Sequence, residues 1–284
     1  MNMISKNMIK TVHSLELKKN RKREGLFVAE GPKVVGDMLG SFLVHALIAT
    51  EEWFSRHARE ISLLDKEELW TKEAWGKVSV TEEELRRTSF LQHPQEVIAL
   101  FQIPDDTELN GVDPSRELCL ALDGVQDPGN LGTIIRIADW FGIDHIICSK
   151  ETADAWNPKV VQATMGSLAH VHLHYTDLNT FLTTVADDVP IYGTLLDGND
   201  RYSTELSDSG IIVMGNEGNG ITESVRKMVS HRLLIPDFHE GKSAESLNVA
   251  IATAIVCSEF RRRRQCRKSE TPPCLELQCA GRGS

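Results

Sequence analysis

The chain has 284 residues, 41% of them hydrophobic, and a formal net charge of −10. This length suffices for two domains with a core each. No apolar run approaches the roughly 18 residues that cross a bilayer, so we expect neither a membrane span nor a signal peptide. Cys119, Cys148 and Cys257 lie in apolar segments, and the other cysteines are at spacings that no zinc motif uses. We therefore expect a reducing compartment, the cytoplasm.

The N-terminal segment is basic although the whole chain is acidic. Between Ser5 and Arg23 a single acidic residue, Glu16, accompanies seven basic ones: Lys6, Lys10, Lys18, Lys19, Arg21, Lys22 and Arg23. A basic cluster on an acidic protein is typical of a contact with a polyanion. A solvated helix face is the alternative interpretation.

The next hundred residues predict a small domain with strands and helices. Glu30-Gly31 and the apolar-periodic residues after it predict a helix that follows a strand. Segments 43–49 and 97–102 predict strands, and 82–87 predicts a short charged helix. The polar stretch 104–116 contains Pro and Gly and lacks periodicity, so we expect it to be a linker between domains 1–103 and 117–264.

A first motif follows the apolar segment 118–122, which predicts a strand. Turn residues then precede a helix that is expected to begin near Asn130 and to stop at Gly142. The helical spacing of its apolar residues points Arg136 away from the buried side. Alone, the segment is also typical of an ordinary capped helix with a surface arginine.

A second motif is the glycine-rich sequence 215–220, Gly-Asn-Glu-Gly-Asn-Gly, after the apolar segment 211–214. Its glycines let backbone approach a ligand, and Glu217 lies among them. The glycine order differs from the dinucleotide-binding fingerprint, and Pro236 stands where a Walker loop ending in Lys242-Ser243 needs a glycine. The sequence thus argues against dinucleotide and nucleoside triphosphate binding.

A third motif, Ser246-Leu247-Asn248, opens a helix rich in alanine, after the segment 233–235 and a polar stretch. Small residues allow this helix to pack closely against other backbone. Alone, the segment is also typical of a capped core helix.

Two further features carry weaker signals. His170, His172 and His174 alternate along a predicted strand, but no carboxylate or cysteine lies at a supporting spacing, so we do not expect a metal. The basic run 261–264 can contact RNA or cap the last helix, and we favour the cap. We expect residues 265–284 to form a disordered tail.

The three motifs, in this order and spacing, resemble the signature motifs of the SpoU (TrmH) family of RNA 2′-O-ribose methyltransferases, within the SPOUT class. The resemblance covers about residues 117–260. The matching residues are Asn130, Gly132, Arg136, Gly215, Glu217, Gly220, Ser246, Leu247 and Asn248. The polar stretch 237–245 is longer than the family usually has before its third motif.

The resemblance implies an α/β fold in which a C-terminal parallel-sheet SPOUT domain with a deep trefoil knot follows a small α/β substrate-binding domain. The segment 21–31 resembles that first domain, which is similar to ribosomal RNA-binding proteins. RNA contacts are then expected from Lys18, Lys19, Arg21, Lys22 and Arg23.

The resemblance also implies S-adenosylmethionine as the cofactor, held by backbone groups of the knot loops without a metal. Apolar walls with backbone donors and acceptors suit its adenine. The corresponding residues here are Thr194, Leu195, Met214, Gly215, Gly218, Ile235 and Leu247.

For the transfer, the resemblance nominates Arg136 as the activating residue. A guanidinium stays protonated in proteins, so we expect Arg136 to hold the target phosphate and ease ionisation of the ribose hydroxyl, with a phosphate oxygen or water accepting the proton. Asn130 would orient Arg136 or the ribose, and Glu217 would fix the guanidinium or the nucleotide. Ser246 and Asn248 would tie the knot loops together and approach the ribose.

The implied enzyme is a homodimer that methylates structured RNA, with ribosomal RNA as the first candidate and transfer RNA as the second. The alternative is a non-catalytic RNA-binding or ribosome-assembly factor that keeps the fold. Base methylation belongs to other SPOUT branches with different motifs.

Overall fold

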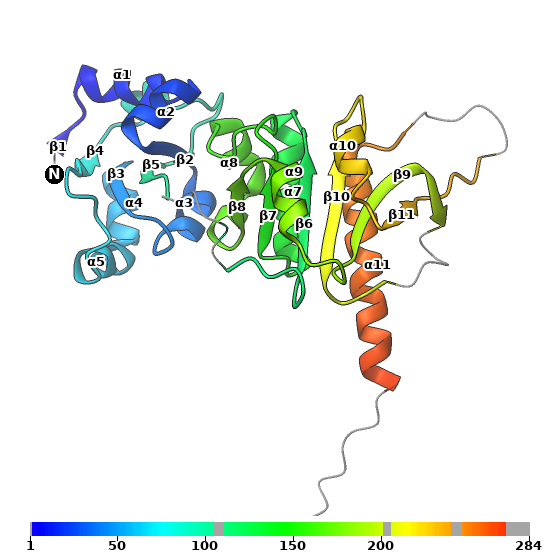
Figure 1. Ribbon diagram of the computed structural model, residues 1–284. Coiled ribbons are helices and arrows are strands. Elements are labelled where there is room, and N and C mark those ends of the chain that lie inside the picture. Colours follow the sequence, from blue (N-terminus) through cyan, green and yellow to red (C-terminus); the bar gives the residue numbers. More distant parts are fainter. Residues whose placement is uncertain (1, 105–108, 110, 201–205, 240–245, 271–284) are drawn as a thin grey trace, which may run out of the picture.

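The computed structural model describes residues 2–104, 109, 111–200, 206–239 and 246–270. They form two α/β domains that lie side by side, each built around one sheet (Figure 1). Within these ranges no helix is both long and apolar enough to cross a membrane.

The N-terminal domain holds a mixed sheet with the strand order β1-β4-β3-β5-β2. Its strands are β1 (Asn2–Met3), β2 (Leu26–Glu30), β3 (Val44–Ala49), β4 (Gly76–Ser79) and β5 (Val97–Gln102). Its helices are α1 (Lys6–Ser14), α2 (Lys18–Glu24), α3 (Pro32–Met38), α4 (Glu51–Arg56), α5 (Ala58–Lys66) and α6 (Glu82–Thr88). The predicted strands at 43–49 and 97–102 and the predicted helix at 82–87 are confirmed as β3, β5 and α6.

The C-terminal domain holds a six-stranded sheet in the order β11-β9-β10-β6-β7-β8, and every pairing in it is parallel. Its strands are β6 (Leu118–Asp123), β7 (His145–Cys148), β8 (His172–Tyr175), β9 (Ile191–Asp200), β10 (Gly210–Gly215) and β11 (His231–Leu234). Its helices are α7 (Pro128–Trp140), α8 (Pro158–Thr164), η1 (Ser167–Ala169), α9 (Leu178–Thr184), α10 (Glu223–Arg226) and α11 (Val249–Glu270). All residues of β6 and β10 are buried, as expected for central strands of a parallel sheet covered on both faces.

The order of the strands brings the first two motifs together. β6 and β10 are neighbours, and their last residues, Asp123 and Gly215, are paired in register. The chain segments that leave these two strands therefore start from the same carboxyl edge of the sheet, where open α/β sheets commonly bind ligands.

The two helices that carry the first and third motifs differ in extent from the predictions. α7 begins at Pro128, because the Asp127 side chain caps it, so Asn130 is its third residue and not its cap. The predicted stop is confirmed, since α7 ends at Trp140 and Gly142 has a left-handed backbone with φ of +60°. α11 continues to Glu270, beyond the predicted domain end at residue 264, so the prediction of a disordered tail is wrong for residues 265–270. The rest of the predicted tail, 271–284, lies outside the described residues.

The two domains share one apolar core. The ring of Trp156, from the segment after β7, packs on Phe27 and Phe42 of the N-terminal domain at centroid distances of 4.8 and 6.0 Å. The buried cluster that contains these phenylalanines runs on through β6, α7 and α11. Helix α8 packs both on α7 and on β2, so the domains are joined by a packed seam as well as by the chain.

The packing of α7 on α8 depends on Gly132. A Cβ at this position would lie 2.5 Å from the Cβ of Ala163 and 2.9 Å from the carbonyl oxygen of Val160. Both distances are shorter than non-bonded atoms allow, and most of the atoms that such a Cβ would meet belong to the backbone of α8, which cannot move aside easily. The glycine thus lets α7 approach α8 closely.

We predict that Gly132→Ala lowers the free energy of unfolding by about 1–3 kcal/mol, because one methyl group overpacks the contact between two helices. Urea unfolding followed by circular dichroism measures this. Gly36→Ala in α3 is the matched control, since a Cβ there meets nothing within 4 Å. The control should raise stability by roughly 0.5–1 kcal/mol, and equal effects of both substitutions would contradict the packing argument.

Candidate active site

Three side chains, one from each motif, are joined by hydrogen bonds at the carboxyl edge of the parallel sheet. The Asn130 side-chain amide donates to Glu217 Oε1 at 3.1 Å. The Asn248 amide in turn donates to Asn130 Oδ1 at 2.9 Å. We call this set, Glu217, Asn130 and Asn248, the amide relay. It connects segments that lie 87 and 118 residues apart in the chain.

Glu217 also holds the turn that precedes α7. Its two carboxylate oxygens accept from the backbone N–H groups of Gln126 and Asp127 at 3.3 and 3.2 Å. Burial raises the pKa of Glu217, but the hydrogen bonds from Asn130 and from backbone N–H groups outweigh it, and the net pKa lies below the ordinary 4.5. The carboxylate is therefore ionised at neutral pH and acts as an acceptor only.

The glycine-rich loop is closed by hydrogen bonds of the Asn216 side chain, which were not among the predicted contacts. Asn216 donates from its amide to Gly124 O at 2.7 Å and accepts from the N–H groups of Gly218 and Asn219. A Cβ at Gly215 would lie 2.2 Å from the backbone of Gly220. The glycine at 215 thus allows the loop to fold back on itself, whereas we had expected it to make room for a ligand. Asn216 belongs to the glycine-rich motif 215–220, and a polar side chain among glycines was the sequence signal that could have predicted its role in closing the loop.

The third motif is fixed at the start of α11. Asn248 Oδ1 accepts from the backbone N–H groups of Ala250 and Ile251 at 3.0 and 3.3 Å, which is the capping pattern at a helix N-terminus. Asn248 therefore uses its oxygen on its own helix and its amide on Asn130. Ser246 and Leu247 are exposed beside it.

Arg136 lies on the exposed side of α7, two turns after Asn130. The exposed residues of this helix are Gly129, Thr133, Arg136 and Trp140, at spacings of a single helix face. In the part of the chain that the structure describes, Arg136 forms no hydrogen bond or ion pair with another residue. Glu217 accepts from Asn130, Asn216 and backbone N–H groups, and among the described residues neither Glu217 nor Asn130 hydrogen-bonds to Arg136. The alternative expectations, that Glu217 fixes the nucleotide and that Asn130 orients the ribose, stay predictions.

The residues nominated for the cofactor come from neighbouring strands and loops: Thr194 and Leu195 follow the part of β9 that pairs with β10, Met214 and Gly215 end β10, and Ile235 follows β11. Thr194 in β9 donates to the carbonyl of Val213 at 3.2 Å and lies 3.7 Å from the sulfur of Met214 in β10. Ile235, just after β11, packs on the core cluster that contains Met214, and Leu195 packs on a neighbouring cluster. Gly215 ends β10, Gly218 is exposed in the loop, and Leu247 is half exposed.

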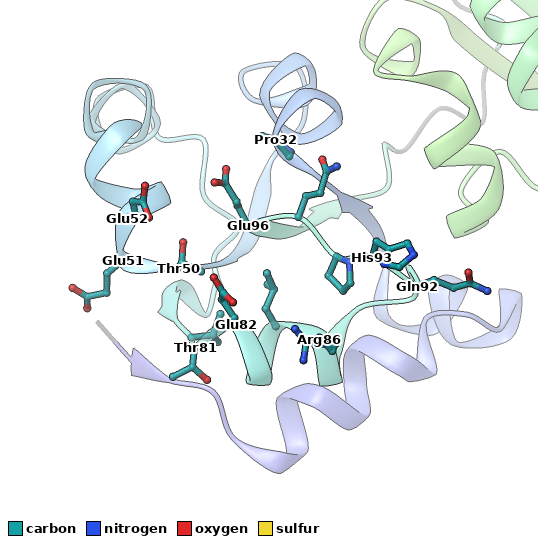
Figure 2. A pocket seen from close by; sticks show the side chains of 14 residues that line it. Pro32, Thr50, Glu51, Glu52, Thr81, Glu82, Arg86, Gln92, His93 and Glu96 are labelled. Atoms are coloured by element: carbon teal, nitrogen blue, oxygen red, sulfur yellow. The ribbon is translucent and has the colours of Figure 1, made fainter.

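A cavity in the N-terminal domain is unsuited to RNA. It measures about 760 Å³ and lies where α3, α4 and α6 begin, with Glu51, Glu52, Glu82 and Glu96 among its lining residues (Figure 2). Carboxylates repel phosphate, so this surface is not expected to bind a polyanion. None of the motif residues lines it.

The basic cluster at the N-terminus divides into exposed and buried residues. Lys18, Lys19 and Lys22 are exposed on α2, and Arg23 pairs with Glu24 at 2.8 Å. Arg21 is only 2% exposed, and its guanidinium binds Asp154 of the C-terminal domain at 2.6 Å. The expectation of an RNA contact from Arg21 is therefore wrong, because its charge is already used inside the protein.

The arginines of the basic run, 261–263, lie in the second half of α11 and bind other groups of the protein. Arg261 donates to the carbonyls of Phe141 and Gly142 at 2.6 and 2.5 Å, so it caps the C-terminal end of α7. Arg262 and Arg263 both bind Glu259, and these pairs hold the pKa of its carboxyl at about 2. The prediction that this run caps the last helix is wrong, because α11 continues to Glu270 and Arg261 caps α7.

Two of the three alternating histidines, His172 and His174, lie in β8 as predicted, and their rings lie 5.4 and 5.2 Å from the ring of His145 in β7. His170 precedes β8 and pairs with Asp139 at 3.3 Å, while His174 shares a 3.0 Å hydrogen bond with His145 of β7. Within the described residues no group of three or more metal-ligating side chains is arranged to hold an ion.

The chain is a two-domain α/β protein in which three linked loops form one candidate site at the carboxyl edge of a parallel sheet. A model of the SpoU rRNA Methylase family matches residues 117–258, and a model of the MRM3-like substrate binding domain matches residues 6–99. The chain belongs to the SpoU rRNA methylase family, and its C-terminal half carries the family's domain.

Relatives match along almost the whole chain. A 23S rRNA (guanosine(2553)-2′-O)-methyltransferase, RlmP of Bacillus subtilis, is 30% identical over 89% of this chain and 95% of its own length. The structure of a Porphyromonas gingivalis protein assigned to the TrmH family of RNA methyltransferases covers 92% of this chain and 99% of that chain, with 41% identity and a TM-score of 0.80. An AdoMet-bound rRNA methyltransferase from Sinorhizobium meliloti covers 93% and 97%, with 29% identity and a TM-score of 0.79.

We predict that Glu217→Gln destabilises the protein by about 1 kcal/mol at pH 7, because the amide keeps one acceptor oxygen and presents a donor to backbone N–H groups. The pKa of Glu217 is lower in the folded protein than its ordinary value of 4.5. The ionised carboxylate therefore contributes its full share to the free energy of unfolding above pH 4.5, and this share is lost as the pH falls through the folded pKa. Thermal unfolding of both proteins between pH 7 and about pH 3 measures the difference. A difference that stays constant down to the lowest pH would show that the charge of Glu217 is not involved.

Proposed function

We propose that this protein transfers a methyl group from S-adenosylmethionine to a ribose 2′-hydroxyl of ribosomal RNA. The observation that carries the proposal is the amide relay, which gathers the three motif loops at one edge of the sheet next to the exposed Arg136. The B. subtilis relative acts on a ribose of 23S rRNA, and the S. meliloti relative binds AdoMet. Transfer RNA is the second substrate candidate.

The residues at the strand ends fit a cofactor with an adenine and a sulfonium. Leu195 and Ile235 are partly exposed and offer apolar surface, while Met214 is buried in the core cluster on which Ile235 packs. The exposed glycine-rich loop offers backbone donors and acceptors. Thr194, Gly215, Gly218 and Leu247 complete the proposed set. The bound cofactor would supply an electrophilic methyl group for in-line attack by the ribose oxygen.

Arg136 is the residue we assign to the substrate. Its guanidinium is exposed and has no partner among the described residues, so its donors are available to a phosphate, for which the planar fork is well suited. A phosphate held there places the neighbouring ribose, and the positive charge favours ionisation of its 2′-hydroxyl. The proton leaves to a phosphate oxygen or to water, because a guanidinium does not accept it.

The relay residues have a supporting role in this mechanism. Glu217 fixes the turn before α7, and Asn130 and Asn248 set the positions of α7 and α11 relative to the glycine-rich loop. Ser246, exposed beside Asn248, is the hydroxyl that we propose to approach the ribose. Lys18, Lys19, Lys22 and Arg23 would contact the RNA backbone farther from the reacting ribose.

We also propose that the third-motif segment forms the family's trefoil knot. This proposal is supported by the path of the chain. β11 lies at the edge of the sheet, beyond β9, and the chain then returns toward the middle of the sheet, where α11 packs on α7 and β10.

The cytoplasm is the proposed compartment. Cys119, Cys148 and Cys257 are free and buried, and burial raises the pKa of Cys119 and Cys257 to about 12. Such thiols are inert small core residues that need no oxidising environment.

We predict that Arg136→Ala leaves the affinity for S-adenosylmethionine within about twofold of wild type and lowers kcat by at least about 100-fold, because the residue meets substrate and not cofactor. Calorimetry with S-adenosylmethionine measures the first value. Transfer of a tritiated methyl group to a large-subunit ribosomal RNA transcript, with mapping of 2′-O-methyl positions in the product, measures the second. Arg136→Lys should recover only part of the activity, since lysine lacks the planar fork.

Wild-type turnover by Arg136→Ala would refute the role of Arg136. A wild-type protein that binds the transcript but neither binds S-adenosylmethionine nor transfers a methyl group would instead support the alternative, a non-catalytic RNA-binding or ribosome-assembly factor.

A homodimer is the proposed assembly. Helices α7 and α11 pack on one another, and large apolar side chains are exposed at their ends: Trp140 at 86% is the last residue of α7, while Leu247 at 51% and Ile251 at 54% lie just before and in the first turn of α11. Exposed apolar side chains on adjacent elements are typical of a protein interface. Arg136 is exposed one turn before Trp140 on α7, so a second subunit that binds there would lie beside the proposed substrate phosphate.

We predict that Trp140→Glu converts the dimer into a monomer, because it places a charge in the apolar interface. Size-exclusion chromatography with light scattering measures the mass. Thr180→Glu, at an exposed position of α9, is the control and should leave the mass unchanged. A dimeric Trp140→Glu protein would show that this face is not the interface.

A further inference from the structure

The segment from Ser149 to Trp156, which follows β7, is the joint between the two domains. On its catalytic side it is bonded to the first-motif turn: Ser149 Oγ accepts from the Gly124 N–H at 3.0 Å, and the Ala153 N–H donates to Val125 O at 2.8 Å. This turn leads directly into α7 and is held from its other end by Glu217. A displacement of the joint would therefore displace the base of α7.

The joint is itself rigid. The Tyr175 hydroxyl donates to Ala153 O at 2.5 Å and accepts from the Ala155 N–H at 2.9 Å, so it closes the segment around one side chain. Trp156 inserts its ring against the phenylalanines of the N-terminal domain, at 4.8 Å from Phe27. These contacts leave the segment little freedom to move separately from either domain.

Arg21 binds this joint from the other domain. Its Nη1 donates to the carbonyls of Leu15 and Glu16 at 2.6 and 2.7 Å, and its Nη2 and Nε donate to Asp154 Oδ2 at 2.6 and 3.3 Å. Asp154 completes its own bonding by accepting from the Trp156 N–H at 3.2 Å. The pair is buried, with 2% and 14% of the two side chains exposed, so neither charge is easily compensated by water once the other is lost.

The helix that Arg21 anchors is the one with the free lysines. Arg21 lies in α2 between Lys19 and Lys22, and Lys18, Lys19 and Lys22 are all exposed. One residue of α2 thus holds the catalytic domain while its neighbours face solvent. Figure 1 shows α2 and β2 on the side of the N-terminal domain that faces α8.

We propose that Arg21 and Asp154 are positioning residues that hold the RNA-binding lysines of α2 at a fixed place relative to Arg136, and that this fixed spacing determines which ribose is methylated. The inference rests on the proposed methyl transfer. The path runs from α2 through Arg21, Asp154 and the Ala153–Val125 hydrogen bond to the turn of α7. Neither Arg21 nor Asp154 touches the substrate.

The test compares Asp154→Asn and Arg21→Ala with the wild-type protein and with Arg59→Ala, an exposed control on α5. Asp154→Asn keeps the shape and removes the charge, so it serves if Arg21→Ala fails to fold; thermal unfolding checks both. Hydrogen exchange of residues 149–157 and small-angle X-ray scattering report on the joint. Methyl transfer to the large-subunit ribosomal RNA transcript, with mapping of the methylated riboses, reports on function.

We expect both variants to bind S-adenosylmethionine like wild type and to keep KM for the transcript within about twofold, because the lysines remain. Their kcat should fall by about 10- to 100-fold, and methyl groups should appear at additional riboses, because the substrate is presented at varying distances. Hydrogen exchange in the joint should accelerate. A purely structural role would lower the amount of folded protein without spreading the methylated positions.

Two results would overturn the inference. The first is an unchanged kcat and an unchanged single methylated ribose in both variants while the joint exchanges faster. The second is a higher KM with unchanged kcat, which would make the pair a binding determinant. Absence of transfer by the wild-type and Arg59→Ala proteins would refute the proposed function itself and is distinguishable from both.

Discussion

The amide relay is the interaction on which the arrangement of the site depends. Carboxamides suit this task because each has a donor and an acceptor, so one Asn can link two partners in different loops. Glu217 at one end is ionised and accepts from both side chain and backbone, which gives the relay a direction: acceptor at the glycine-rich loop, donor at α11. A carboxylate that receives several N–H donors is also held more firmly than a neutral acceptor. The relay therefore contributes protein–protein hydrogen bonds that hold the three loops together.

The relay leaves Arg136 unused, and this is consistent with its proposed work. Had Glu217 paired with Arg136, the guanidinium would have been neutralised and its donors occupied before a phosphate arrived. In the structure Glu217 accepts from the Asn130 amide, and Arg136 faces solvent about two turns farther along α7. Other arginines of the chain are employed in the opposite manner. Arg21 and Arg261 bind carboxylate or carbonyl groups and join elements far apart in sequence.

The distribution of charge explains how an acidic chain can engage RNA. The net charge of −10 is a sum over the whole surface, and a polyanion responds to the local field. Glutamates gather around the cavity of the N-terminal domain, while Lys18, Lys19 and Lys22 stand together on α2 beside the domain seam. The N-terminal domain therefore has an acidic surface around the cavity and a basic surface on α2, and only the second suits RNA. In the proposed mechanism, Arg21 and the joint hold this basic surface at a defined position relative to Arg136.

Local patterns in the sequence determined most of the secondary structure and the composition of the site. Apolar runs specified β3, β5, β6 and β10. The motif residues Asn130, Glu217 and Asn248 could be named because their three segments resemble the signature motifs of the family. The partners of these residues could not be named. That Glu217 binds Asn130 and not Arg136, that Gly215 serves loop closure, and that Arg21 is buried all depend on contacts between segments up to 133 residues apart. Such contacts follow from how the two sheets and their helices pack, and neither periodicity nor charge clustering carries that information.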